Sequence, residues 1–171
     1  MLREARKIAI IGISGSGKSV LSRVLHDQTG LPLFHMDQLF WRGNWEAIPE
    51  EEYVIQHEDI LARENTWIIE GYVDEKMARR LTAADVILYL DYSGVRCFFR
   101  VLKRWLRHRY ESRPELPNEA LERFDRKFLW IVFNRLERPA IEKALARAGN
   151  PKAIRSSSPR ELKSFLEGEI L

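Results

Sequence analysis

One short segment constrains this chain more than any other. Gly12 to Ser19 reads GISGSGKS and fits the pattern GxxxxGK[ST] in full. It follows a continuous apolar run, Lys7 to Gly12, and precedes Lys18 to Gln28, where apolar residues recur at helical spacing. A buried strand, a glycine loop and a helix in this order are typical of a phosphate-binding loop, because glycines let successive backbone N–H groups point inward and the helix N-terminus attracts negative charge. The segment therefore predicts a site for nucleotide phosphates.

The residues of this loop have separate tasks. We expect Lys18 to bridge the β- and γ-phosphates of ATP, and Ser19 to offer its hydroxyl to Mg²⁺. A carboxylate at the end of a neighbouring strand is needed near the metal ion, and Glu70 and Asp91 compete for this position. Asp37 is a third carboxylate that reaches the same crevice. The predicted ATP-binding residues of the loop are Gly12, Ser14, Gly15, Ser16, Gly17, Lys18, Ser19 and Val20.

Apolar runs and helical patterns alternate along the rest of the chain. Further strands are predicted at 31–36, 66–69, 85–90 and 152–156. Helices are predicted at 49–64, at 93–109, at 118–149 with a bend or break near Pro139, and at 159–167. Strands that are apolar throughout and alternate with helices indicate an α/β fold, with a five-stranded parallel sheet covered on both faces. A length of 171 residues fits a single domain across 1–171.

Composition narrows the cellular setting. Charged residues make up 31% and hydrophobic residues 45%, as in ordinary soluble proteins, and no apolar run approaches the roughly 18 residues that span a membrane. Cys97 is the only cysteine, so no disulfide can form within the chain and no cysteine cluster can hold a metal. Met1 to Lys7 lack the pattern of a secretory leader. We therefore expect a cytoplasmic protein with no membrane partner.

A basic cluster lies in the predicted helix 93–109 and just beyond it. Seven Lys and Arg residues but only one acid, Glu111, fall between Arg96 and Arg113. Helical spacing gives the helix an apolar face that contains Phe98 and Trp105. The basic side chains on the opposite face are Arg96, Arg100, Lys103, Arg104 and Arg107. Such a face either contacts an anionic partner or is simply solvated.

Several motifs together give the chain a family resemblance. They are the loop GISGSGKS, the spaced residues His35, Asp37, Trp41 and Trp45, the segment WIIEGY from Trp67 to Tyr72, and the pair Arg100 and Arg104. On these residues the chain resembles, across nearly its whole length, the adenylate kinase-related P-loop kinases known as topology modulation proteins. One departure is that family members often read Asp-Gly-Asn-Tyr where this chain has Glu70-Gly71-Tyr72.

The resemblance implies more than the motifs themselves. It implies a nucleotide kinase-like three-layer fold with strand order 2-3-1-4-5, a substrate flap at about 38–64 and a lid region at about 107–118. It also implies that Glu70 helps to hold hydrated magnesium, that Arg100 lies near the adenine and that Arg104 contacts phosphates. By the same resemblance, the loop that contains Ser157 touches the adenine, although helix capping by a serine explains that loop without a ligand.

The segment His35 to Trp45 is suited to a pocket wall. Asp37 can fix or deprotonate a hydroxyl, and aromatic rings there can stack on a planar acceptor. We expect Phe40 and Trp45 to serve mainly in packing, and Trp41 and Arg42 to belong to the site.

The sequence as a whole favours an ATP- and Mg²⁺-dependent kinase that transfers the γ-phosphoryl group to a small acceptor, with Lys18, Asp37 and Arg104 as catalytic residues and Ser19 and Glu70 at the metal. Two alternatives remain open. One is an ATP-binding, nucleic-acid-binding regulator of DNA topology, suggested by the family name, the basic helix and a pI near 9.1. The other is an ATPase without an acceptor.

Overall fold

A five-stranded parallel sheet forms the centre of the molecule. The computed structural model describes residues 1–42, 45–108, 124–149, 151 and 153–170. The strands of the sheet are β1 (Lys7–Gly12), β2 (Leu33–His35), β5 (Trp67–Glu70), β6 (Val86–Leu90) and β7 (Ala153–Ser156). Their order across the sheet is β2-β5-β1-β6-β7, and every pairing is parallel. Counted within this sheet alone, that is the order 2-3-1-4-5, so this prediction is confirmed.

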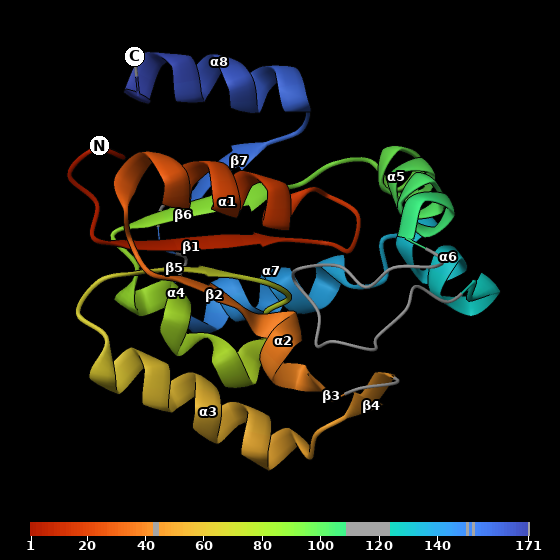
Figure 1. Ribbon diagram of the computed structural model, residues 1–171, viewed down its shortest axis with the longest axis horizontal. Coiled ribbons are helices and arrows are strands. Elements are labelled where there is room, and N and C mark those ends of the chain that lie inside the picture. The colour runs from red at the N-terminus through yellow and green to blue at the C-terminus, as the bar shows by residue number, and fades with distance from the viewer. Residues whose placement is uncertain (43–44, 109–123, 150, 152, 171) are drawn as a thin grey trace.

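Helices cover both faces of the sheet, as the alternating pattern predicted (Figure 1). One face carries α1 (Lys18–Thr29) and α8 (Pro159–Ile170). The other carries α3 (Glu50–Arg63), α4 (Arg79–Ala83) and α7 (Arg138–Arg147). Two more helices, α5 (Gly94–His108) and α6 (Arg126–Phe133), lie beyond the carboxyl ends of the strands, on the right of Figure 1. The α/β, three-layer fold is therefore confirmed. In such sheets, ligands bind beyond the carboxyl ends of the strands.

The core follows from the apolar strands. Ile8 to Ile11 of β1 and Trp67 to Ile69 of β5 have no exposed surface, because β1 and β5 are covered by helices on both sides. Burial of such side chains contributes about 1.5–3 kcal/mol each. The central strands can therefore hold the loops at their carboxyl ends in fixed positions.

The predicted helix 118–149 is two helices in the described region, which begins at residue 124. Asp125 caps α6 by accepting hydrogen bonds from the backbone N–H groups of Lys127 and Phe128. The break lies at 134–137, before Pro139, and Arg135 there has a left-handed φ of 56°. Pro139 lies in the first turn of α7, where its missing N–H removes no helical hydrogen bond. The helix is therefore broken near Pro139, as predicted, with the break directly before the proline and not at it.

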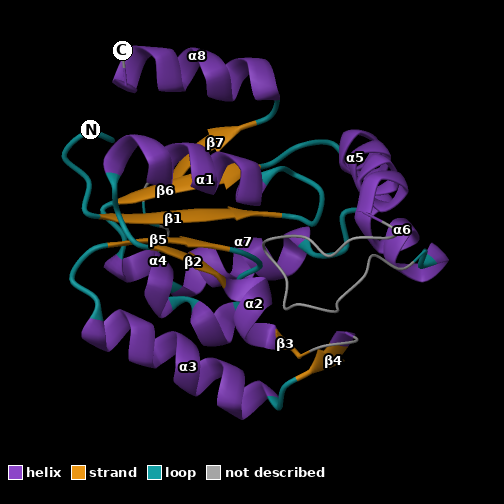
Figure 2. Cartoon of the chain, in the orientation of Figure 1, coloured by secondary structure: helices purple, strands orange, loops and turns teal. Residues whose placement is uncertain are grey.

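Short elements that the sequence did not reveal follow β2 and β5. After β2 come α2 (Met36–Phe40) and an antiparallel hairpin of β3 (Trp41–Arg42) and β4 (Glu46–Ala47). After β5 comes a 3₁₀ helix, η2 (Glu75–Met77). Figure 2 shows the hairpin beyond the edge of the main sheet, on the same side of the molecule as α5 and α6. The predicted flap at 38–64 therefore comprises most of α2, this hairpin and α3.

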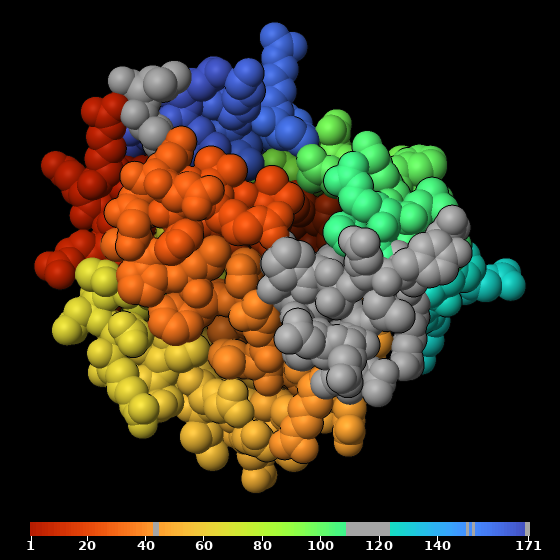
Figure 3. Space-filling view, in the orientation of Figure 1, coloured from red at the N-terminus to blue at the C-terminus, as the bar shows by residue number. Residues whose placement is uncertain are grey.

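The two ends of the described chain meet. The amino group of Met1 lies 2.8 Å from a carboxylate oxygen of Glu169, which also accepts a hydrogen bond from the backbone N–H of Leu2. Figure 3 shows the first and last segments, red and blue, at the same end of the molecule. None of the described helices is both long and apolar enough to cross a membrane.

Candidate active site

The phosphate loop connects β1 to α1 through three glycines with positive φ. The φ angles are 152° at Gly12, 79° at Gly15 and 98° at Gly17. Residues that have a Cβ atom rarely adopt this region. Space is equally restrictive at Gly15, where a Cβ would lie 2.6 Å from the carbonyl oxygen of Cys97 in α5. The glycines of the motif are thus required both by the turn and by the close packing of α5 on the loop.

The loop has two features that suit a phosphate group. The hydroxyl of Ser16 is buried and has no hydrogen-bond partner among the described residues. The first turn of α1 contains no acid, so the positive end of the helix dipole there is not neutralised by a carboxylate of its own. Lys18 lies back along the loop, where its ammonium group donates to the carbonyl oxygens of Gly12 at 2.9 Å and Ile13 at 3.1 Å.

Ser19 and Glu70, the two predicted metal ligands, lie together. Glu70 ends β5 and is 2% exposed, and its carboxylate lies 2.6 Å from Nδ1 of His35. Burial alone would raise the pKa of Glu70, but the hydrogen bond with His35, the charge of Lys18 and the Ser19 hydroxyl together hold that pKa below its usual value. The carboxylate is therefore ionised at neutral pH despite its burial.

These groups fit a magnesium ion that is bound mainly by nucleotide phosphates. Mg²⁺ in such sites takes one or two protein oxygens and otherwise phosphate oxygens and water. No group of three or more His, Cys, Asp or Glu side chains in the described part of the chain could form a cation site by itself. The hydroxyl of Ser19 and the carboxylate of Glu70 lie side by side at the loop, and they match the one or two protein oxygens that a phosphate-bound Mg²⁺ takes.

Asp91, the competing candidate for the metal, is engaged by arginines. It accepts a bidentate pair of hydrogen bonds from Arg138, at 3.0 and 3.1 Å, and is also bonded to Arg135. Arg155 lies 3.5 Å away. Burial alone would raise the pKa of Asp91, but these cations hold it below its usual value. The geometry thus gives Asp91 a structural task, which is to anchor the 134–138 turn to the end of β6.

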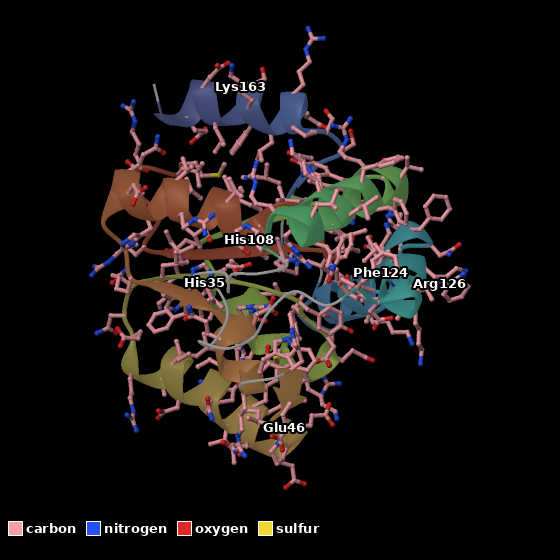
Figure 4. All side chains as sticks on the ribbon, turned by 45° about the vertical axis from the view of Figure 1, so that its right-hand side comes forward. His35, Glu46, His108, Phe124, Arg126 and Lys163 are labelled. Carbon is pink, nitrogen blue, oxygen red and sulfur yellow. The ribbon has the colours of Figure 1, made fainter. Side chains whose placement is uncertain are left out.

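Asp37 lines a cavity of about 580 Å³ beside the loop, which Ser14 of the loop and Arg104 of α5 also line. Asp37 is in the first turn of α2, directly after β2. Figure 4 labels His35, the last residue of β2, near the centre of the molecule, whereas Glu46 of the hairpin lies at its edge. The cavity therefore opens where the loop, the segment after β2 and helix α5 meet.

Aromatic side chains form much of the cavity wall. The ring centroids of Phe40 and Trp41 are 4.7 Å apart, and those of Trp41 and Trp45 are 5.4 Å apart. All three rings line the cavity, so Phe40 and Trp45 do more than pack. Arg42 is not among the described lining residues. It is exposed and pairs with Glu52 at 3.2 Å.

The basic residues of α5 differ in exposure, so the predicted basic face is only partly solvated. Arg96, Lys103 and Arg107 are exposed, but Arg100 and Arg104 are half-buried. Arg100 donates to the carbonyl oxygen of Ser16 in the loop at 2.7 Å, and Arg104 lines the cavity. Helix α5 therefore directs two arginines, one turn apart, toward the loop and the cavity. Most of the predicted lid at 107–118 falls outside the described residues.

Ser157 follows β7, at the same edge of the sheet as the phosphate loop. Its N–H and hydroxyl both donate to the carboxylate of Glu161, at 2.7 and 2.8 Å. The hydroxyl of Ser158 in turn accepts from the N–H of Glu161 at 3.3 Å. This reciprocal arrangement caps the N-terminus of α8, as the capping alternative predicted. Contact of Ser157 with adenine stays a prediction.

Glu137 is a residue of the site that no sequence pattern indicated. Glu137, which immediately precedes α7, accepts a hydrogen bond from the N–H of Ser14 at 2.5 Å and another from the Ser14 hydroxyl at 2.7 Å. The two residues are 123 positions apart, and Glu137 belongs to no motif. Tyr53 and Phe128 also line the cavity and belong to no motif, whereas Tyr72, a third lining residue, ends the segment WIIEGY.

The chain is similar in fold to a solved nucleoside kinase. The structure of a deoxyadenosine kinase from M. mycoides with bound dATP matches with a TM-score of 0.51 and 15% sequence identity, over 95% of this chain and 98% of that chain. At this identity the similarity establishes the P-loop kinase fold and nothing finer. No protein-family model and no curated protein matches the sequence, so the resemblance to topology modulation proteins stays a prediction.

Proposed function

We propose that this chain is a cytoplasmic, ATP- and Mg²⁺-dependent phosphotransferase that acts on a small acceptor. The observation that carries the proposal is that one cavity is lined by Ser14 of the phosphate loop, by the carboxylate of Asp37 and by Arg104. The proposed site of the phosphoryl donor, the proposed base Asp37 and the cation Arg104 thus border the same cavity. The fold, which is shared with a deoxyadenosine kinase, agrees with this proposal.

In the proposed reaction the acceptor hydroxyl attacks the γ-phosphorus of ATP and ADP leaves. Asp37 orients this hydroxyl and takes up its proton, while Lys18 and Arg104 stabilise the charge of the transferring group. Mg²⁺, held through Ser19 and Glu70, would neutralise charge on the phosphates. The loop around Lys18, with Val20 at the start of α1 and with Arg100 and Ser157 near the adenine, would position the nucleotide.

The two alternatives receive less support. Arg100 and Arg104 face the loop and the cavity, so a nucleic-acid-binding surface on α5 would lack two of its five cations. The aromatic cavity of about 580 Å³ next to the loop offers room for an acceptor, which an ATPase does not require. We therefore also propose that residues 38–64 and 107–118 act as the substrate flap and the lid.

Replacement of Lys18 tests the proposal. Lys18→Ala should weaken ATP binding at least about tenfold and abolish phosphoryl transfer. The fold should survive, because the hydrogen bonds of Lys18 within the described part of the chain go to loop carbonyls. Calorimetry and thermal melting measure the two effects, with Lys163→Ala as the control because Lys163 is exposed on α8. Equal ATP affinity in wild type and Lys18→Ala would refute the phosphate-loop assignment.

A further inference from the structure

The cavity beside the phosphate loop has an unusual combination of wall groups. Its volume of about 580 Å³ is in the range of small-molecule sites. Among the described residues, six aromatic side chains from three separate parts of the chain line it: Phe40, Trp41, Trp45, Tyr53, Tyr72 and Phe128. Aromatic faces offer large apolar contact to a planar ring, and they attract cations by their quadrupole. The wall is thus suited to a planar ligand.

The charged groups of the same wall are mostly negative. Among the described residues that line the cavity, two are cationic, Lys76 and Arg104, and five are carboxylates: Asp37, Glu50, Asp74, Asp125 and Glu137. Lys76 is paired with Glu50 at 2.5 Å, so these two charges offset each other. Arg104 is then the remaining cation of the described wall, against four carboxylates.

The hydrogen bonds of three of these carboxylates leave their charge in place. Asp74 accepts from two backbone N–H groups of η2, Asp125 from two of α6, and Glu137 from the Ser14 N–H and hydroxyl. Such donors orient a carboxylate but carry no net charge. Behind the wall, Arg80 and Glu70 are both buried and opposite in sign, so they do not change the balance.

This balance discriminates between classes of acceptor. A phosphate monoester carries about −1.5 to −2 charges at neutral pH, and like charges brought together at a binding site oppose binding. An uncharged ring compound with a hydroxyl group meets no such repulsion, and an amino group on it would be attracted. The aromatic wall contributes equally in both cases, so the charge decides.

We propose that the acceptor is a planar ring compound bearing a hydroxyl and carrying no negative charge, of the nucleoside class, and that nucleoside monophosphates are excluded. This inference rests on the proposed function and specifies its substrate. The acceptor oxygen forms a bond to the γ-phosphorus of ATP, the bond from that phosphorus to the β–γ bridging oxygen breaks, ADP leaves, and the acceptor proton passes to Asp37.

The test compares nucleosides with their own 5′-monophosphates. Binding is followed by the fluorescence of Trp41 and Trp45, which line the cavity, and by calorimetry. Turnover with ATP is measured separately. The wild type should bind nucleosides at least about tenfold more tightly than the matched monophosphates, with phosphoryl transfer to nucleosides alone.

Asp74 and Asp125 are N-caps, and their negative charges can be removed while the helices that they cap are kept. Serine can replace aspartate as an N-cap, so the double variant Asp74→Ser, Asp125→Ser keeps both caps and removes two charges. It should reduce the preference for nucleosides at least about fivefold. Asp85→Ser is the matched control, because Asp85 also accepts from two backbone N–H groups, those of Arg6 and Lys7, at the opposite ends of the strands. It should leave the preference unchanged.

Each outcome decides between the proposals. Monophosphates that bind as tightly as nucleosides, or a preference that the double variant leaves unchanged, would overturn this inference. Turnover of monophosphates with ATP would keep the phosphotransferase proposal and overturn only the acceptor class. Nucleoside binding without any ATP binding would overturn the phosphotransferase proposal and, with it, the naming of this ligand as the acceptor.

Discussion

Glu137 holds a negative charge against the loop that should receive the phosphates of ATP. Its carboxylate takes the N–H and the hydroxyl of Ser14, and the turn that carries it is fixed in place by Arg135 and Arg138, both bonded to Asp91. Glu137→Gln keeps the size of the side chain and an oxygen that can still accept from Ser14. The variant removes the charge, and its NH2 group, which replaces the second oxygen, can donate to the Ser14 hydroxyl instead of accepting from it. We expect it to bind ATP more tightly.

Coulomb's law gives the size of the effect. A carboxylate on Ser14 and a phosphate held by the next residues of the loop are about 6 Å apart, and at an effective dielectric constant of about 20 two unit charges at that distance repel by about 3 kcal/mol. Solvent and Mg²⁺ screen part of this, which leaves about 1–2 kcal/mol. Affinity for ATP should therefore rise about five- to thirtyfold. Because the cause is charge, the gain should increase from AMP to ADP to ATP and vanish for adenosine.

Calorimetry with this series of nucleotides, in wild type and Glu137→Gln, is the assay. Glu142→Gln is the matched control, since Glu142 lies in α7, which directly follows Glu137, and bonds to Arg138 and Arg155 rather than to the loop. Melting temperatures show whether the fold is retained. The reasoning fails if Glu137→Gln binds ATP no better than wild type while melting normally, or if adenosine gains as much as ATP.

Three more outcomes follow from the structure. Arg104→Ala should lower turnover about a hundredfold while changing ATP affinity less than about threefold, because the arginine acts mainly as charge develops; steady-state kinetics and calorimetry separate the two, with exposed Lys103→Ala as control. Gly94→Ala should destabilise the fold by more than about 3 kcal/mol in denaturant unfolding, since its Cβ would lie 1.9 Å from the Phe133 carbonyl oxygen; a loss below 1 kcal/mol would contradict this packing. Burial and nearby arginines lower the pKa of His57 to about 3, so below pH 6.5 the unfolded chain takes up a proton that the folded protein does not. The free energy of unfolding should therefore fall by up to about 1.4 kcal/mol per pH unit between pH 6.5 and 5. In His57→Leu, denaturant unfolding at these pH values should no longer show this dependence.

The parts of the fold that could be predicted are those in which neighbouring residues carry the signal. Apolar runs such as Ile8 to Ile11 form buried strands, and the glycines of the loop predict the turn that follows. The order of the strands followed from a family resemblance. By contrast, the β3–β4 hairpin has two residues in each strand, too few for any alternation to be visible.

The break between α6 and α7 shows a different limit. Proline is the strongest local signal for a break, and Pro139 was given that role, yet a proline in the first turn of a helix is compatible with it. The chain turns earlier, where Arg135 takes a left-handed conformation and bonds to Asp91 of a distant segment. A tertiary ion pair therefore fixes the turn, and no pattern within 118–149 contains its partner.

The charges at the site depend on one another in a way that only the fold defines. Arg79 and Arg80 are neighbours in the sequence, but Arg79 is exposed and pairs with Glu58, whereas Arg80 is fully buried. Arg80 donates to the carbonyl oxygens of Gly71 and Tyr72, the turn directly after Glu70, at 3.4 and 3.0 Å.

A buried guanidinium needs negative charge nearby, and Glu70 and Asp74 supply it while burial itself lowers the pKa of Arg80. The same cation lies beside the turn in which this chain has Gly71-Tyr72 and lacks the asparagine common among the proteins it resembles. Arg80 thus holds that turn by its two hydrogen bonds. The backbone directly after the carboxylate proposed for the metal is therefore fixed by an arginine that belongs to no motif.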